Sequence, residues 1–178
     1  MGLIFKQRGL IGNGGTPVSN PPRGIGGFLF HARGDDMPKS QIAIPYELRE
    51  TLQRGLTHYK IIFISAGSGW GKTTAVNKLL EKQNAACLSL RKKPLPNYFS
   101  KERLIVLDDF QELPPQAEQQ FQEILRKSQR GQHFVLISRA PLPEYLSIYE
   151  ATGSLLQLGS DNLALDMECL TQLVQTRN

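Results

Sequence analysis

The stretch Ser65-Ala66-Gly67-Ser68-Gly69-Trp70-Gly71-Lys72-Thr73-Thr74 joins two segments of different character. Residues 59–64 before it are rich in β-branched and aromatic side chains and predict a strand, whereas residues 74–82 after it predict a helix. A strand, a glycine-rich turn and a helix that begins at Gly-Lys-Thr form a phosphate-binding loop, the Walker A motif. This order of elements predicts a nucleotide site on an α/β fold.

Each residue type in the loop has a physical role toward a polyphosphate. Small side chains let backbone N–H groups surround the phosphates, and the helix N-terminus adds partial positive charge. Lys72 would contact the β- and γ-phosphates, and the Thr73 hydroxyl would bind Mg²⁺. The alternative is a glycine-rich turn that binds nothing, and Ala66 stands where the motif has its first glycine. The predicted nucleotide-binding residues are Ala66, Gly67, Ser68, Gly69, Trp70, Gly71, Lys72, Thr73 and Thr74.

The composition sets bounds on the class of protein. The 178 residues are enough for one domain with a buried core. The net charge of +5 is compatible with nucleic acid or an anionic ligand, but it is spread along the chain. Cys87 and Cys169 lie far apart, which argues against a disulfide framework or a zinc site. No apolar run has the length of a membrane span and no signal pattern opens the chain, so we expect a cytoplasmic protein.

Residues 1–41 are predicted to form a glycine-rich, largely disordered N-terminal arm. Nine of the chain's 16 glycines fall in residues 1–36, together with three prolines. Such a composition buries too little apolar surface to offset its ordering entropy. Two alternatives are a basic arm that binds nucleic acid and an upstream extension from a misplaced start codon, since Met37 opens a segment of ordinary globular composition.

Residues 103–110, Arg-Leu-Ile-Val-Leu-Asp-Asp-Phe, place two acids at the end of an apolar run. Such a run is typical of a central parallel strand that is covered on both faces, and its C-terminal end lies where α/β sheets bind ligands. This is a Walker B pattern, in which Asp108 would hold Mg²⁺ and Asp109 would orient or deprotonate the attacking water. The alternative is that two aspartates after a strand serve only as turn residues.

Residues 133–139 predict another strand, which ends in Arg139. A fixed cation at this sheet edge would reach the γ-phosphate and report that the nucleotide is a triphosphate. The alternative is an arginine that pairs with a nearby carboxylate such as Asp109.

The remaining elements complete an alternating pattern. Strands are predicted at 86–90 and 155–158, and helices after Pro45 up to Gly55, at 116–130, at 142–152 and from Asp166 to about 175. The connection from 91 to 101 is predicted to be a solvated loop, barely long enough for a parallel crossover. Together the elements predict a three-layer α/β P-loop NTPase domain with a five-stranded, mainly parallel sheet. Weak candidates for adenine contacts, with core packing as the alternative, are Ile44, Pro45 and Tyr46.

Several of these segments together resemble the nucleotide-binding domain of MalT-like STAND ATPases, the large LuxR-type transcriptional activators. The resemblance spans 42–178 and rests on the two Walker motifs, a Ser-Arg-x-Pro strand end and a closing Leu-Gly-Ser-Asp-Asn-Leu-Ala-Leu-Asp sequence. The matching segments are Phe63–Thr74, Cys87–Leu90, Val106–Phe110, Leu136–Pro141 and Leu158–Asp166.

The resemblance implies a function for the predicted residues. Lys72, Asp109 and Arg139 would be catalytic, and Thr73 and Asp108 would hold Mg²⁺ beside ATP. The chain would be an ATP-binding, slowly hydrolysing switch domain, which self-associates or binds a regulatory protein. The alternative is a non-catalytic nucleotide-binding scaffold module.

Two departures from the family stand out. The segment before the Asp-Asp strand is short, and the lid, winged-helix, sensor and helix-turn-helix regions have no counterpart. We therefore expect a truncated fragment of such a regulator, with no DNA-binding motif of its own.

Overall fold

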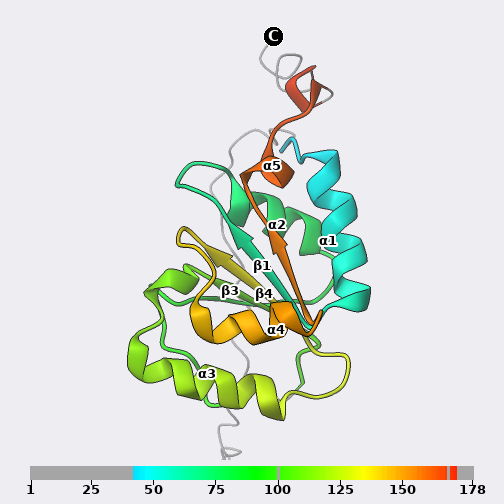
Figure 1. The fold of residues 1–178 in the computed structure, drawn as a ribbon. Helices are drawn as coiled ribbons and strands as arrows, with labels where there is room; N and C mark the ends of the chain where they lie inside the picture. Colours follow the sequence, from blue (N-terminus) through cyan, green and yellow to red (C-terminus); the bar gives the residue numbers. More distant parts are fainter. Residues whose placement is uncertain (1–41, 100, 168, 172–178) are drawn as a thin grey trace, which may run out of the picture. The chain divides into compact units, whose positions relative to one another are not determined.

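The computed structural model describes residues 42–99, 101–167 and 169–171, and the predicted N-terminal arm lies outside them. Helices and strands alternate along this part of the chain, except that the second strand is followed directly by the third (Figure 1). The strands are β1 Ile61–Ser65, β2 Ala86–Ser89, β3 Leu104–Asp108, β4 His133–Ser138 and β5 Leu155–Leu158. The α-helices are α1 Tyr46–His58, α2 Lys72–Leu80, α3 Pro115–Lys127, α4 Ser147–Ala151 and α5 Ser160–Leu163, with 3₁₀ turns η1 Phe110–Glu112 and η2 Glu144–Leu146.

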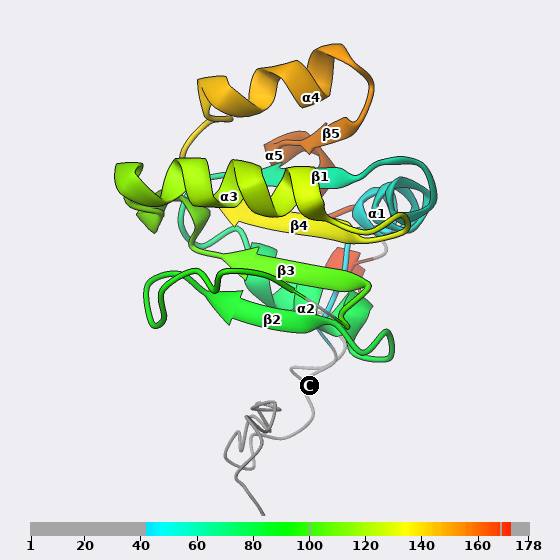
Figure 2. The ribbon, with the colours of Figure 1, turned by 90° about the horizontal axis from the view of Figure 1, so that it is seen from below.

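The five strands form one sheet in the order β2-β3-β4-β1-β5, and every pair is parallel (Figure 2). The predicted sheet is thus confirmed, and it is parallel throughout. Ser65 at the end of β1 pairs with Ser138 at the end of β4, and Ser89 at the end of β2 pairs with Asp108 at the end of β3. The register therefore places four strand ends along one edge of the sheet.

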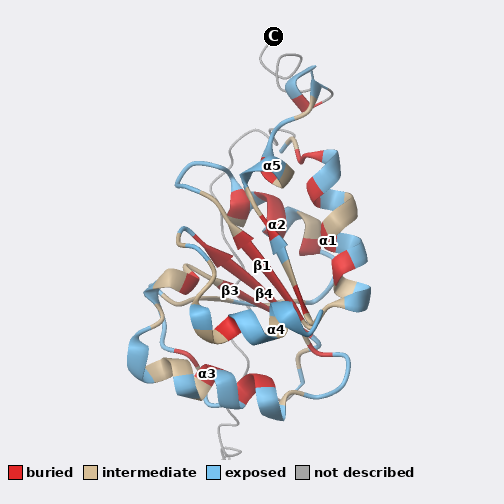
Figure 3. Cartoon of the chain, in the orientation of Figure 1, coloured by how far each residue is buried: buried red, intermediate tan, exposed pale blue. Residues whose placement is uncertain are grey.

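Helices cover both faces of the sheet, which makes the fold a three-layer α/β architecture. Side chains alternate along β1, so that Ile62 and Ile64 pack with α1, α2 and α5, whereas Ile61 and Phe63 pack with α3 and η2. The central strands are buried in Figure 3, and the outward faces of the helices are exposed. This burial on both faces explains the continuous apolar runs of β1, β3 and β4.

Several element boundaries differ from the predictions. The segment predicted as a helix at 142–152 divides into the 3₁₀ turn η2 and the short helix α4, and α5 was not predicted. The helix predicted after Asp166 is present at the described residues 167 and 169–171, and the rest of it lies outside them. None of the described helices is long and apolar enough to cross a membrane.

The connection between β2 and β3 contains no helix among its described residues, but it is not simply a solvated loop. Residues 91–94 are exposed, whereas Leu95 is buried against the α3 face. The Gln120 side chain of α3 donates to the carbonyls of Leu95 and Pro96, each at 3.1 Å. The crossover is therefore short and held against the domain.

Gly55 was predicted to end α1, but the helix continues to His58. The glycine is needed for close approach instead, because a Cβ atom there would lie 2.9 Å from Ile62 Cδ1 and 3.0 Å from Leu156 Cδ2. α1 thus packs tightly over β1 and β5 at this point.

We expect Gly55→Val to lower the free energy of unfolding by about 1–3 kcal/mol, because the larger side chain overpacks this contact. Urea unfolding measures the change. Gln53→Val, at an exposed position of the same helix, controls for helix propensity and is expected to cost about 0.5 kcal/mol or less. Equal losses in the two variants would contradict the close-packing explanation.

Candidate functional site

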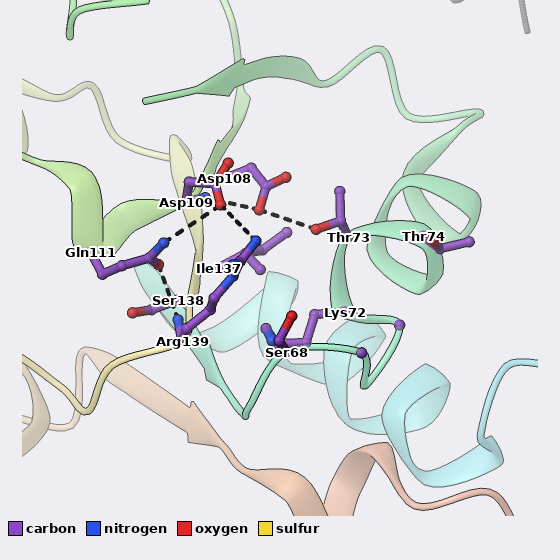
Figure 4. Close-up of a pocket in the computed structure, with 12 residues that line it drawn as sticks. Ser68, Lys72, Thr73, Thr74, Asp108, Asp109, Gln111, Ile137, Ser138 and Arg139 are labelled. Atoms are coloured by element: carbon purple, nitrogen blue, oxygen red, sulfur yellow. Dashed lines mark hydrogen bonds and ion pairs between the residues drawn. The ribbon is translucent and has the colours of Figure 1, made fainter. Parts of the chain in front are cut away.

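The carboxyl ends of β1, β3 and β4 surround a cavity of about 140 Å³ (Figure 4). The chain leaves β1 toward one edge of the sheet and leaves β4 toward the other edge, and α/β sheets bind ligands at such a switch point. Three separate predicted motifs meet here. The cavity is lined by Ser68, Gly69, Gly71, Lys72, Thr73, Thr74, Asp108, Asp109, Gln111, Ile137, Ser138 and Arg139.

The loop between β1 and α2 has a conformation that requires glycine at two points. Gly69 has φ +84° and Gly71, the N-cap of α2, has φ +71°. A Cβ atom at either position would meet nothing within 4 Å, so the backbone angle, not space, selects glycine. These turns present the N-terminus of α2 to the cavity, where its N–H groups and partial positive charge favour an anion.

Lys72 opens α2 and is almost fully buried, with 7% of its surface exposed. Its Nζ donates to the carbonyls of Ala66 and Gly67, each at 2.7 Å. Burial lowers the pKa of Lys72 below its usual range, and the Arg139 guanidinium lowers it further, against the opposing effect of the two aspartates. Ala66 and Gly67 therefore position the lysine and do not line the cavity themselves.

Thr73 and Asp108, the two predicted metal ligands, lie next to each other. The Thr73 hydroxyl donates to Asp108 Oδ1 at 3.1 Å, and the same oxygen accepts from the Asp109 backbone N–H at 2.9 Å. Among the described residues, no three or more His, Cys, Asp or Glu side chains are grouped so that they could hold a metal ion by themselves. A hydroxyl beside a single carboxylate fits Mg²⁺, which takes most of its ligands from water and phosphate oxygens.

Asp109 turns the chain directly after β3, with φ +54° and ψ +42°. Few residues other than glycine adopt this left-handed conformation, although aspartate tolerates it better than most. Its carboxylate is largely buried and accepts hydrogen bonds from Ser89 Oγ at 3.1 Å and Gln111 Nε2 at 3.5 Å. Two arginines, Arg91 at 3.8 Å and Arg139 at 3.5 Å, complete its surroundings.

Arg139 follows β4 and is anchored through its backbone N–H, which donates to Gln111 Oε1 at 3.0 Å. Its guanidinium lies 3.5 Å from Asp109 Oδ1, so the carboxylate pairing considered as an alternative is present (Figure 4). About half of the side chain is exposed, and it borders the same cavity as Lys72. The sensor role of Arg139 stays a prediction.

A larger, mainly apolar groove of about 800 Å³ adjoins the loop. Pro45 lines it, whereas Ile44 is packed in the core and Tyr46 is 63% exposed and outside the lining. Of the three weak adenine candidates, only Pro45 borders the groove. The groove is lined by Ile42, Ala43, Pro45, Ser68, Gly69, Trp70, Gly71, Thr74, Ala75, Leu163, Ala164 and Leu165.

Asp166 ties the far wall of this groove to the start of α1. Its Oδ2 accepts from the Tyr46 backbone N–H at 3.0 Å, and its Oδ1 accepts from the Cys169 N–H at 2.8 Å. The contact to Cys169 caps the helix that was predicted to begin at Asp166, whereas the contact to Tyr46 was not predicted. The Asn162 side chain reinforces the link by donating to Glu47 Oε1 at 3.2 Å.

We expect Asp166→Ala to lower the free energy of unfolding by about 1–2 kcal/mol, because two helix N-termini lose their cap. Chemical denaturation measures the loss, and faster hydrogen exchange at the Tyr46 amide locates it. Asp161→Ala, at an exposed position of α5, is the matched control. Unchanged exchange at Tyr46 in the Asp166→Ala variant would contradict the link between the two segments.

Sequence reasoning missed some residues of the site. Ser89 and Gln111 contact Asp109, and Leu163 to Leu165 line the groove. Gln111 follows the Asp-Asp pair by two positions without any recognisable spacing. Ser89 carried a weak signal, since it is the next-to-last residue of the strand predicted at 86–90.

The fold and the site define a three-layer α/β domain with a cavity at its sheet edge. No family model matches the chain, and the search of curated proteins finds no match. Its function is therefore inferred from the chemistry of the cavity and the groove.

Proposed function

We propose that this chain binds ATP·Mg²⁺ and hydrolyses it slowly, as a switch domain. One observation carries the proposal: a buried lysine at a helix N-terminus, a hydroxyl–carboxylate pair, a second carboxylate and an arginine share one cavity that adjoins an apolar groove. The Gly-Lys-Thr sequence and the Asp-Asp strand end supply these groups in the order that a phosphate loop and a Walker B strand require.

The charges in the cavity suit a magnesium-bound triphosphate. Lys72 and Arg139 repel each other across it, which the lowered pKa of Lys72 reflects in part. An anion placed between the two cations would relieve this repulsion. Thr73 and Asp108 would hold Mg²⁺ in the same cavity, where the metal would neutralise charge on the phosphates.

The groove suits the base of the nucleotide. Ligand pockets are mostly apolar and range from about 300 to 1,000 Å³. None of the described residues that line the groove is Asp, Glu, Asn or Gln. Guanine presents a ring N–H and an amino group side by side, a pair that one carboxylate can accept, whereas adenine presents a single amino group. A lining without carboxylate or amide side chains therefore favours adenine.

Two contacts and one family resemblance support the switch role. Arg139 contacts Asp109 and borders the cavity, and Asp166 links the segment after α5 to the start of α1. A bound nucleotide would therefore lie against segments from the beginning and the end of the described chain. The resemblance to MalT-like STAND ATPases suggests a module of a LuxR-type transcriptional regulator, with self-association or a regulatory protein as its partner. We further propose a cytoplasmic location, because two widely separated cysteines are not the pattern of a secreted disulfide framework.

The second candidate is a non-catalytic scaffold that binds nucleotide to stabilise a partner surface. The surroundings of Asp109 favour it, because Ser89, Gln111 and two arginines already engage the carboxylate. In this case the wild-type chain would bind ATP but release no phosphate.

Trp70 provides a direct test of nucleotide binding. It is the chain's one tryptophan, lines the groove and is 46% exposed. We expect Mg·ATP to change its fluorescence saturably, and GTP to do so only at concentrations about tenfold higher or more, since a missing acceptor costs about 1–3 kcal/mol. An unchanged emission together with an unchanged melting temperature would contradict the proposal.

A further inference from the structure

Arg91 contacts the predicted hydrolytic acid from a segment that the sequence assigned to a solvated loop. Its Nη2 lies 3.1 Å from Glu112 Oε1 and 3.8 Å from Asp109 Oδ1. The guanidinium thus lies between two carboxylates of the β3 strand end. It does not line the cavity itself, unlike Arg139.

The backbone fixes this placement on both sides. After β2, the Leu90 N–H donates to the Asp108 carbonyl at 2.9 Å, and the N–H groups of Lys92 and Lys93 close a turn on the Ser89 carbonyl. After β3, the Glu112 N–H donates to the Asp109 carbonyl at 2.8 Å, which closes the 3₁₀ turn that carries Glu112. Two hydrogen-bonded turns therefore hold Arg91 and its partners together.

The two arginines that contact Asp109 differ in whether a bound nucleotide could draw them away from it. Arg139 borders the cavity and is half exposed, so its guanidinium is free to turn from Asp109 toward a γ-phosphate. Arg91 pairs with Glu112 outside the cavity, so the binding of a nucleotide would leave its contacts intact. Once Arg139 had moved, Asp109 would keep Arg91 as its cationic partner and Ser89 as its hydroxyl donor.

We propose that Arg91 is a positioning residue, which holds the Asp109 carboxylate in its hydrolytic orientation while Arg139 contacts the γ-phosphate. The inference rests on the proposed function. In that reaction the oxygen of water forms a bond to the γ-phosphorus, and the bond from phosphorus to the bridging oxygen breaks. ADP leaves with the electron pair of that bond, and the proton of the water passes to Asp109 and then to solvent.

Steady-state ATP hydrolysis and ATP binding by the wild type and three variants test this role. Arg91→Ala is expected to lower kcat by about tenfold, with KM and ATP affinity close to wild type, because only the orientation of the acid is lost. Arg91→Lys restores the charge but not the planar fork, so its kcat should fall between the two. Lys92→Ala, at the exposed neighbouring position, is the matched control.

A second readout does not depend on turnover. Arg91→Ala should bind ADP with aluminium fluoride, a transition-state analogue, about tenfold more weakly than wild type, while its affinity for ADP alone is unchanged. Equal kcat in wild type and Arg91→Ala, or a kcat loss that Arg91→Lys does not relieve and that accompanies a lowered melting temperature, would overturn the role of Arg91 alone. A wild-type chain that does not bind ATP would overturn the proposed function as well.

Discussion

Replacing Lys72 with alanine is expected to weaken ATP·Mg²⁺ binding by about 100-fold. Hydrogen bonds from a charged group contribute about 1.5–3 kcal/mol each, and Lys72 is placed to reach two phosphates. A loss of about 3 kcal/mol corresponds to about 100-fold in affinity. Titration of the Trp70 fluorescence measures it, because the tryptophan lies in the same loop.

The control for this variant is Lys78→Ala. Lys78 is another lysine of α2, but it is exposed and pairs with Glu81 at the surface, at 2.8 Å. Its removal should leave ATP affinity unchanged. Comparable affinity in Lys72→Ala and wild type would mean that the lysine serves its own loop, where it bonds the Ala66 and Gly67 carbonyls, and not a phosphate.

Asp109→Asn is expected to reduce phosphate release by about 100-fold or more, with ATP binding retained, because an amide cannot accept the proton of the attacking water. The variant keeps the shape of the side chain and one oxygen that accepts from Ser89. Single-turnover hydrolysis measures the chemical step directly. Asp161→Asn, an exposed aspartate of α5, should hydrolyse at the wild-type rate.

The same pair of measurements separates the two candidate functions. A wild-type chain that binds ATP and releases no phosphate would favour the scaffold function. Wild-type hydrolysis that survives in Asp109→Asn would contradict the assignment of the acid and direct attention to Gln111, which borders the cavity.

The core of the fold could be predicted because strands that are buried on both faces need apolar residues, which are visible in the sequence. β1, β3 and β4 are covered on both faces, so their apolar runs are unbroken, and the parallel sheet follows from strands that alternate with helices. Shorter elements contain too few residues to show a pattern. α5 has four residues, and four residues cannot show a helical period.

The site could be predicted where a motif places chemically active residue types in a recognisable order along the chain. The Walker-type segments named eight of the twelve residues that line the cavity, and the β4 strand end named a ninth, Arg139. Figure 4 shows the labelled ones converging on the cavity. Arg91 and Ser89 were missed because tertiary contacts bring them to Asp109, and Gln111 was missed because its position after the Asp-Asp pair follows no recognisable spacing. Gly55 was misassigned for a similar reason, since a glycine selected for helix–sheet contact and one that ends a helix look alike in sequence.

Isothermal titration calorimetry with the wild-type chain tests the central claim most directly. ATP is titrated with and without Mg²⁺, and GTP serves as the comparison. The account predicts one ATP bound per chain, tighter binding with Mg²⁺ because Thr73 and Asp108 gain a ligand, and weaker binding of GTP. Absence of any heat of ATP binding under conditions where the chain is folded would contradict it.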